Sequence, residues 1–379
     1  MASSLSPLLY VRRNPGKTLP IAFVIVLAVS LVASIVTIVH SIDLTIFTLY
    51  GYNRYLTGIT PRNALAVDET ELNKVRRLPE LGHLYQAHSY QTMIKTIFGK
   101  MVFPIFGLDT AGRTELLKRC HIRLSAGRMP EDGKAEAVLS DQVATNLHLK
   151  IGDILSRPEF QDSYAPIPVK LVGLLHGPVW LGLTSKALVD RESPYNFVGA
   201  LAFARTDDPA DQARLAEAID RCVDKNKGRV WKFAGLVQEA QSALSNLYLI
   251  MNIVIGIIVF AISFVCGLLF NIYFTQRMPE IAMLSAIGYA RSHLIARAVG
   301  ETVLLCLFGW ALGGVATFGI LLGIRETLMT PRGLLLNPFD LQAFAFTLPV
   351  PLVITGFALC TIGLRLATLD TVSIIERRA

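Results

Sequence analysis

The residue types that carry out catalysis or bind metals occur in this sequence, but their spacing matches no catalytic or metal-binding pattern. The chain contains no HExxH or CxxC pair that would hold zinc, and no GxSxG turn that would activate a serine. It also contains no GxxxxGKS/T loop, whose backbone amides and lysine would bind the phosphates of ATP. The sequence therefore predicts a chain that is not itself an enzyme, with no catalytic residue, no metal site and no cofactor of its own.

The cysteines leave one question open. Cys266, Cys306 and Cys360 lie in apolar stretches, where a free thiol behaves as a small apolar side chain. Cys120 and Cys222 lie in the charged part of the chain and could form a disulfide in an oxidising compartment. They are far apart in the sequence, so the pattern is compatible with a disulfide and with two free thiols.

Residues 277–293 form a short mixed segment between two apolar stretches. Ile281, Leu284 and Ile287 recur at helical spacing, and Gly288 is a suitable C-terminal stop. We therefore expect a short amphipathic helix here. Exposed apolar side chains on such a helix are costly in water unless something covers them. The cover is either lipid headgroups and neighbouring helices, or a groove on a cytoplasmic protein.

The elements around this segment follow from the distribution of charge. Of the 29 acidic residues, 23 lie between Asp43 and Glu239, and 25 of the 36 basic residues lie between Arg54 and Lys232. The whole chain is only 17% charged and 52% hydrophobic, whereas soluble domains are about 25% charged. This balance excludes a soluble enzyme of ordinary domains, a disordered chain and a small disulfide scaffold. It predicts a membrane protein with one large water-exposed domain.

Four apolar segments are long enough to cross a bilayer, which takes about 20 helical residues. We expect transmembrane helices at residues 19–42, within 240–276, at 294–324 and at 344–364. Residues 240–276 are uncharged and as one helix would be about 55 Å long. The surplus length is either a rigid stalk or a linker beside a tilted span.

The third span contains glycines at a spacing that lets helices approach closely, either within one chain or in a dimer: Gly309, Gly313, Gly319 and Gly323.

Basic residues set the orientation. Residues 1–18, 275–301 and 365–379 together contain nine basic and four acidic residues, which places both termini in the cytoplasm. Residues 43–239 and the short loop 325–343 then lie outside. Residues 1–18 are either an amphipathic helix at the membrane surface or a plain basic flank. The outer domain has 25 basic and 23 acidic residues, which gives no reason to expect nucleic acid as a partner.

The outer domain is expected to be α+β. Two β-α-β units predict a ferredoxin-like arrangement, interrupted by a β-rich insertion at about residues 110–193. The predicted strands are Ala64–Val67, Gly82–Ile97, Lys100–Leu108, Phe197–Ala204 and Arg229–Phe233, and the predicted helices are Glu69–Arg77 and Asp208–Lys225.

Two sets of residues resemble a known family. After the second span come Arg277, the pair Glu280-Ile281, the turn Ala286-Ile287-Gly288, a basic stretch from Arg291 to Arg297, and Glu301. This order is similar to the coupling region of the FtsX-like permease family, the MacB/LolC/LolE type of ABC transporter subunit. Met278-Pro279 replaces the charged pair usual in that family, and Asp370–Val372 replaces its common proline-containing tail.

The outer domain carries the second resemblance. Leu124–Pro130, Glu136–Ser140 and Leu149–Asp153 look like successive signatures of the MacB-type periplasmic core domain, and Val169–Leu175 resembles the strand that follows them. The two resemblances together cover nearly the whole chain.

The resemblance implies the permease subunit of an ABC transporter in a bacterial cell (inner) membrane. A separate cytoplasmic ATPase dimer would bind ATP and magnesium. Its hydrolysis cycle would move the outer domain by mechanotransmission, to export or extract a lipid, lipoprotein, peptide or drug. Other implied partners are the lipid bilayer, a second permease subunit (identical or different) and a periplasmic adaptor. The alternative is an FtsX-like signal relay that activates a cell-wall hydrolase without cargo. The implied ATPase-coupling residues are Glu280, Ile281, Met283, Leu284, Ala286, Ile287, Gly288, Tyr289 and Arg291.

Overall fold

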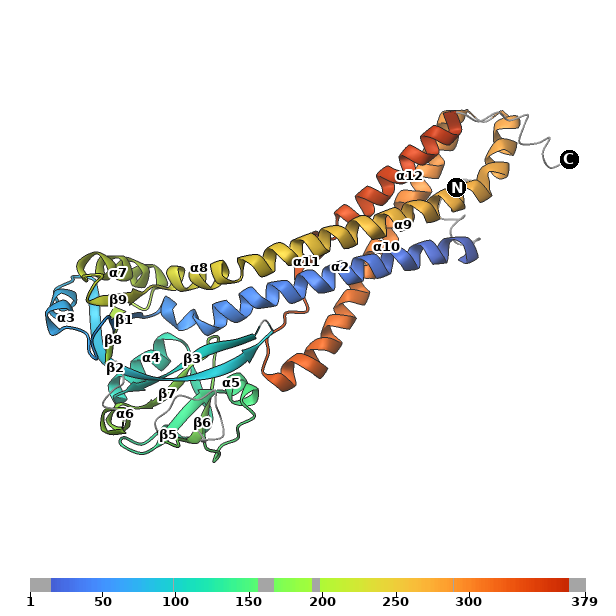
Figure 1. Cartoon of the computed structure of the whole chain (residues 1–379). Coiled ribbons are helices and arrows are strands. Elements are labelled where there is room, and N and C mark those ends of the chain that lie inside the picture. The colour runs from blue at the N-terminus through green and yellow to red at the C-terminus, as the bar shows by residue number, and fades with distance from the viewer. Residues whose placement is uncertain (1–14, 98, 156–166, 193–197, 289, 368–379) are drawn as a thin grey trace. The chain divides into compact units, whose positions relative to one another are not determined.

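The computed structural model describes residues 15–97, 99–155, 167–192, 198–288 and 290–367 (Figure 1). The chain forms two compact units. We call them the helical unit (Met1–His40, Asn246–Arg325 and Asn337–Ala379) and the sheet unit (Ser41–Ser245 and Glu326–Leu336). The chain therefore passes between the units at four points. Most of the predicted N-terminal segment, residues 1–14, and of the tail, residues 368–379, lies outside the described residues.

The helical unit is built from apolar helices. The longer ones are α2 (Pro15–Leu49, whose last nine residues enter the sheet unit), α9 (Ser245–Ala286), α10 (Arg291–Ile324) and α12 (Pro349–Ala367), and α11 (Leu341–Ala345) is a single short turn. Within the part of the chain that the structure describes, three segments are long and apolar enough to cross a membrane: Thr18–Leu49, Ser245–Gln276 and Ser292–Arg332. The fourth apolar segment among the described residues, Leu341–Gly356, is shorter, and the fourth span remains a prediction.

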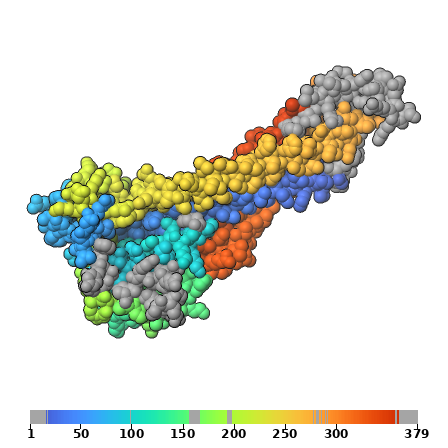
Figure 2. All heavy atoms as spheres, in the orientation of Figure 1, coloured from blue at the N-terminus to red at the C-terminus, as the bar shows by residue number. Residues whose placement is uncertain are grey.

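The core of the helical unit is formed where α2, α9, α10 and α12 meet. Ile25 and Val29 of α2, Phe270 of α9 and Ile354 of α12 are completely buried in it. The opposite face of α9 is apolar but exposed, with Ile257, Phe260 and Phe264 each more than half accessible. In Figure 2 the atoms of α9, yellow to orange, form a continuous strip on the visible face. A helix that is apolar all round is typical of a membrane span.

The predicted helix boundaries around residues 240–290 need two corrections. Residues 240–276 do not form one helix, because α8 (Phe233–Ala243) ends at its C-cap Leu244 and α9 begins at Ser245. At its other end α9 does not stop near residue 276 but continues to Ala286, with Pro279 inside it. A proline inside a helix removes one backbone hydrogen bond, and in transmembrane helices neighbouring groups compensate for that loss.

In the sheet unit, four strands form a ferredoxin-like half. They are β1 (Thr57–Pro61), β2 (Leu81–Thr96), β8 (Gly199–Ala204) and β9 (Gly228–Trp231), in the order β2-β8-β1-β9 with every neighbour antiparallel. Helices α3 (Glu69–Arg76) and α7 (Pro209–Cys222) connect β1 to β2 and β8 to β9, so each connected pair has another strand between its members. This is the split β-α-β order. Asp68 and Asp208 cap the two helices through their side chains.

One predicted strand is misplaced. Ala64–Val67 is not a regular strand, and only Ala66 forms an isolated bridge, to Val198. The first strand of the unit is β1, at Thr57–Pro61. Phe197, the predicted first residue of the later strand, lies outside the described residues, and β8 begins at Gly199.

The other half of the sheet extends from the same long strand. β2 pairs with β8 over Leu81–Ala87 and with β3 over His88–Thr96, so both halves belong to one nine-stranded sheet. The order continues β2-β3-β7-β5-β6-β4. The elements of this half are β3 (Gly99–Leu108), α4 (Thr110–Arg119), β4 (Arg123–Gly127), β5 (Glu136–Ser140), α5 (Asp141–Asn146), β6 (Lys170–His176), β7 (Gly182–Ser185) and α6 (Lys186–Glu192).

The segment expected as a short outer loop contributes to this half of the sheet unit. Residues 326–336, which we call the strap, follow α10 and include η3 (Thr330–Arg332) after the π-helical turn η2 (Arg325–Met329). The Asn146 amide donates to the Arg332 carbonyl at 2.8 Å, and Leu335 packs on a core cluster that contains Tyr90 and Trp180. Gly333, at φ 63°, lies so close to the Gln142 carbonyl that a Cβ would come within 2.2 Å of that oxygen.

Candidate functional site: the turn between α9 and α10

Of the described residues with the predicted coupling role, those from Glu280 to Ala286 lie at the end of α9, Ile287 and Gly288 lie in the turn that follows, and Arg291 is the first residue of α10. The Ile287 amide donates to the Met283 carbonyl at 3.1 Å, which extends the helical hydrogen bonding to the turn. Gly288 has φ 101°, a conformation that favours glycine, and lets the chain reverse. Helix α10 then begins at Arg291, with Ala290 as its N-cap. The predicted separate amphipathic helix is therefore the last part of α9.

The turn presents apolar side chains outward. Met283 is 61% exposed and Ile287 is 72% exposed, whereas Leu284 and Met278 pack against the core of the helical unit. Ala286 and Gly288 are also exposed. The side chains of Glu280, Ile281 and Arg291, and Tyr289 as a whole, lie outside what the structure describes.

Just beyond the turn, α10 contains a buried carboxylate. The side chain of Glu301 is 1% exposed, and the Arg297 guanidinium lies 3.2 Å from it, one helical turn earlier. A buried charge must be paired or hydrogen-bonded, and Arg297, on the same helix, is such a partner for Glu301.

The four glycines of α10 separate into two kinds. A Cβ on Gly309 would lie 2.8 Å from Ile25 Cγ2, and one on Gly313 would lie 2.7 Å from Val29 Cβ, so both allow α2 to pack closely. The Ser30 hydroxyl also donates to the Gly313 carbonyl at 3.2 Å. A Cβ on Gly319 or Gly323 would have no atom within 4 Å. The first pair therefore serves packing within the chain, and the predicted role in a dimer stays open only for the second.

In the sheet unit, the motif residues Arg128 and Glu136 form an internal ion pair. The Arg128 guanidinium donates to Glu136 Oε2 at 2.7 Å, and the Glu131 amide donates to the same oxygen at 3.1 Å. The hydrogen bond from Arg128 is the main reason why the pKa of Glu136 is lowered. These contacts fold residues 128–136 into a closed loop, so their role is structural.

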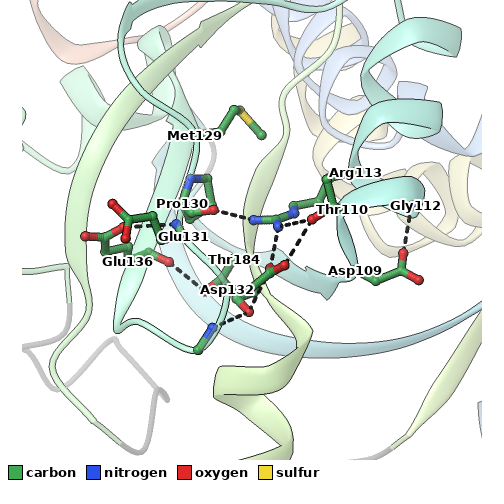
Figure 3. A network of polar contacts seen from close by, with 12 residues as sticks. Asp109, Thr110, Gly112, Arg113, Met129, Pro130, Glu131, Asp132, Glu136 and Thr184 are labelled. Atoms are coloured by element: carbon green, nitrogen blue, oxygen red, sulfur yellow. Dashed lines mark hydrogen bonds and ion pairs between the residues drawn. The ribbon is translucent and has the colours of Figure 1, made fainter.

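A second arginine holds the same loop from the other side (Figure 3). Arg113 of α4 donates to the Pro130 carbonyl at 2.6 Å, to the Thr110 hydroxyl at 3.0 Å and to Asp132 at 2.5 Å. Its side chain is only 5% exposed. The sequence analysis missed Arg113, because it is separated from its partners by up to 19 residues and no local pattern links them.

Cys120 and Cys222 do not form a disulfide; both are free thiols. Cys120 is buried in the cluster around Leu116 and Phe203, and Cys222 packs on a different cluster around Ile219 and Val75. Burial raises the pKa of Cys120 to about 12, which keeps it protonated and unreactive. Among the described residues, no group of three or more His, Cys, Asp or Glu side chains could hold a metal ion.

The C-terminal third of the chain is similar to a known protein family. Residues 252–372 match the family model described as FtsX-like permease C-terminal. No curated protein matches the sequence.

Three solved structures align with part of the chain. The periplasmic region of MacB from Actinobacillus actinomycetemcomitans aligns at 9% identity and TM-score 0.30, over 49% of this chain and 92% of that one. The extracellular domain of the noncanonic ABC-type transporter YknZ from Gram-positive bacteria aligns at 11% identity and TM-score 0.30, over 47% and 100%. A domain of a putative permease protein from Porphyromonas gingivalis aligns at 12% identity and TM-score 0.23, over 46% and 85%.

Proposed function

We propose, from the match of residues 252–372 to the FtsX-like permease C-terminal family model, that the protein is the membrane subunit of an ABC transporter driven by a separate cytoplasmic ATPase. The ATPase dimer would bind ATP and magnesium and would contact the α9–α10 turn. The sheet unit would lie on the other side of the membrane and perform the work.

The continuity of α9 is the observation that carries this proposal. The helix has 42 residues, which corresponds to about 63 Å at the helical rise per residue, well beyond about 30 Å of hydrocarbon. It begins where the chain leaves the sheet unit and ends at the turn. A single helix transmits a displacement from one end to the other, because its backbone hydrogen bonds resist stretching and bending.

The turn has the properties of a docking element. Met283 and Ile287 are exposed apolar side chains at the tip of a helix, and apolar tips of this kind bind in hydrophobic grooves of partner proteins. The excess of basic residues flanking the spans on this side supports a cytoplasmic location for the turn. Closure of two ATPase subunits would then move the turns of two permease chains, and each α9 would pass the motion to its own sheet unit.

Two outcomes of that motion remain candidates. One is export or extraction of a lipid, lipoprotein, peptide or drug, aided by a periplasmic adaptor. The other is a signal relay that activates a cell-wall hydrolase without cargo. Both use the same coupling at the turn, so the proteins bound to the sheet unit distinguish them.

The experiment that tests the coupling is affinity purification of the whole chain from its native membranes, with identification of every co-purifying protein. The test variant carries Met283→Asp and Ile287→Asp, because these exposed side chains do not support the core. The control is Ser292→Asp, which adds a charge at an exposed residue in the first turn of α10, next to the α9–α10 turn. Leu284→Asp is unsuitable, since Leu284 packs in the helical unit.

We expect an ATPase with a phosphate-binding loop to co-purify with the native chain and with Ser292→Asp, and to be lost from the double variant at unchanged thermal stability. An adaptor in the same eluate would favour transport, and a hydrolase would favour the relay. If no ATPase co-purifies with the native chain, or if the double variant retains it, the coupling proposal is wrong.

A further inference from the structure

The helical unit contains a cavity that the coupling proposal does not use. Its volume is about 470 Å³, it is open on one side, and it is lined by α2, α10 and residues 338–344. A volume of this size lies in the range of pockets that hold one small ligand. The surrounding segments of α2 and α10 are both long and apolar enough to be membrane spans.

The floor of the cavity is buried, whereas its rim is exposed and apolar. On the floor, Ala33 of α2 and Leu321 of α10 are each 1% exposed. At the rim, Val315, Phe339 and Leu341 are 71%, 76% and 75% exposed. A rim of large apolar side chains is unfavourable in water and favourable in hydrocarbon. The mouth of the cavity therefore suits contact with the apolar interior of a bilayer.

The wall is held in a fixed shape by aromatic contacts. Trp310 stacks on Phe344 with ring centroids 4.3 Å apart, and its indole N–H donates to the Thr347 hydroxyl at 2.9 Å. Phe318 meets Phe339 edge to face at 5.6 Å. The cavity is thus bounded by side chains that hold one another in place, which favours a preformed site.

The acidic side chain in the cavity lining, Asp340, already has partners within the protein. One oxygen of Asp340 accepts from the Ala343 amide at 2.9 Å and the other lies 2.6 Å from His40 Nδ1. Both carboxylate oxygens have partners within the protein, so this group does not require a polar ligand. The remaining lining is dominated by apolar side chains, and the chemistry of the site is that of an alkyl chain.

From the buried floor, the apolar rim and the paired acid, we propose that this cavity binds one acyl chain of a bilayer phospholipid. The chain enters laterally across the rim of Val315, Phe339 and Leu341 and fills the space against Trp310. A bilayer phospholipid is the apolar chain that is present at this mouth whenever α2 and α10 span a membrane. The bound chain fills a void between α10 and the segment that leads into α11, which stabilises their packing.

Trp310 provides the test. The sequence contains three tryptophans, and the other two, Trp180 and Trp231, belong to the sheet unit. The whole chain in detergent micelles is titrated with a phosphatidylcholine brominated on its acyl chains, which quenches fluorescence on contact. The same titration of Trp310→Phe is subtracted, so the difference reports Trp310 alone.

The matched variants lie on one helix. Ala311→Leu adds bulk to the cavity lining, whereas Gly319→Leu adds a similar side chain at a position with no neighbouring atom within 4 Å, outside the cavity. Native mass spectrometry of the native chain counts the retained phospholipids independently.

Circular dichroism establishes that each variant is folded. If Ala311→Leu does not fold, Phe339→Ala, which removes part of the rim, takes its place.

We expect quenching of Trp310 to saturate at a low mole fraction of brominated lipid, to be reversed by unlabelled phosphatidylcholine, and to correspond to one retained lipid. Ala311→Leu should weaken this binding at least tenfold, and Gly319→Leu should leave it unchanged. Quenching that rises linearly with lipid content and is equal in both variants would mean ordinary lipid contact and would overturn the proposal. Loss of quenching at raised protein concentration would also overturn it, because a second copy would then cover the cavity.

Discussion

At the scale of single residues, Arg113 and Asp132 form an ion pair whose two members differ in exposure. The Arg113 side chain is 5% exposed and Asp132 is 57% exposed. Arg113→Met leaves the Pro130 carbonyl and the Thr110 hydroxyl without their donor, and we expect the free energy of unfolding to fall by about 2 to 3 kcal/mol. Asp132→Asn should cost less than about 1 kcal/mol, because Asp132 is exposed to water and the asparagine oxygen can still accept from Arg113. Chemical denaturation followed by circular dichroism measures both.

The matched control for Arg113 is another arginine in an ion pair. Arg214 pairs with Asp211, but its side chain is 74% exposed. Arg214→Met should change the free energy of unfolding by no more than about 0.5 kcal/mol. Equal effects of Arg113→Met and Arg214→Met would show that burial of the guanidinium contributes nothing.

We expect the buried His88 to make the stability of the sheet unit depend on pH. Burial lowers the pKa of His88, and the nearby Asp190 carboxylate, 2.6 Å from its Nε2, opposes this only in part. Lys186 also lowers that pKa. A folded pKa below the ordinary 6.5 means that the unfolded chain binds more protons. The contribution of His88 is therefore complete above about pH 6.5 and is lost as the pH falls towards the folded pKa.

The measurement is the thermal unfolding midpoint between pH 7.5 and 5. We expect the midpoint of the native chain to fall over this range, and His88→Gln to flatten the fall. His83→Gln, which changes an exposed histidine on the same strand, should leave the native slope intact. If the unfolding midpoint of His88→Gln falls with pH as steeply as that of the native chain, the buried imidazole is not the cause of the pH dependence.

At the scale of secondary-structure elements, the close contact between α2 and α10 depends on particular glycines. Leucine at position 313 would force Val29 and α2 away, since even a Cβ would come within 2.7 Å of Val29. We expect Gly313→Leu to lower the free energy of unfolding of the helical unit by about 1 to 3 kcal/mol. Gly319→Leu, on the same helix with no atom near its Cβ, should be close to neutral. Unfolding in mixed micelles by circular dichroism compares them, and equal losses would contradict this packing.

The elements that are predicted best from the sequence are those whose own residues carry a clear strand or helix pattern. The predicted strands Gly82–Ile97 and Lys100–Leu108 lie within one residue of β2 and β3 at each end, because aromatic and β-branched side chains recur along both stretches. β1 escaped prediction because Gly58 and Pro61 weaken its strand pattern, although pairing with β8 and β9 holds it. The second span was expected to end at residue 276 because the uncharged stretch ends there, before Arg277, whereas α9 continues to Ala286.

At the scale of the whole molecule, the strap could not be located from the sequence. It lies between α10 and α12 along the chain, yet residues 326–336 belong to the sheet unit. The link depends on Asn146, which is 186 residues away from Arg332, and no periodicity reports a contact of that length. The only local signal is the apolar run Leu334–Leu336 in a segment expected to be an exposed loop.

The strap should therefore stabilise the sheet unit measurably. Two soluble fragments test this: residues 41–245 alone, and the same residues joined to 326–336 by a flexible glycine-serine linker. We expect the second fragment to unfold at a higher temperature, because the strap buries Leu335 against the core and adds the hydrogen bond from Asn146. Gly333→Ala should remove that gain, since its Cβ would collide with the Gln142 carbonyl.

Asn146→Ala in both fragments isolates the contact itself. In the strap-free fragment Asn146 still bonds the amide and the carbonyl of Lys95, each at 2.8 Å, so the substitution is costly there too. In the joined fragment it also removes the bond to Arg332, and the difference between the two losses should be about 1 kcal/mol. If Asn146→Ala costs the same in both fragments, the strap does not dock through Asn146. The docking of the strap would then rest on other contacts, such as the packing of Leu335.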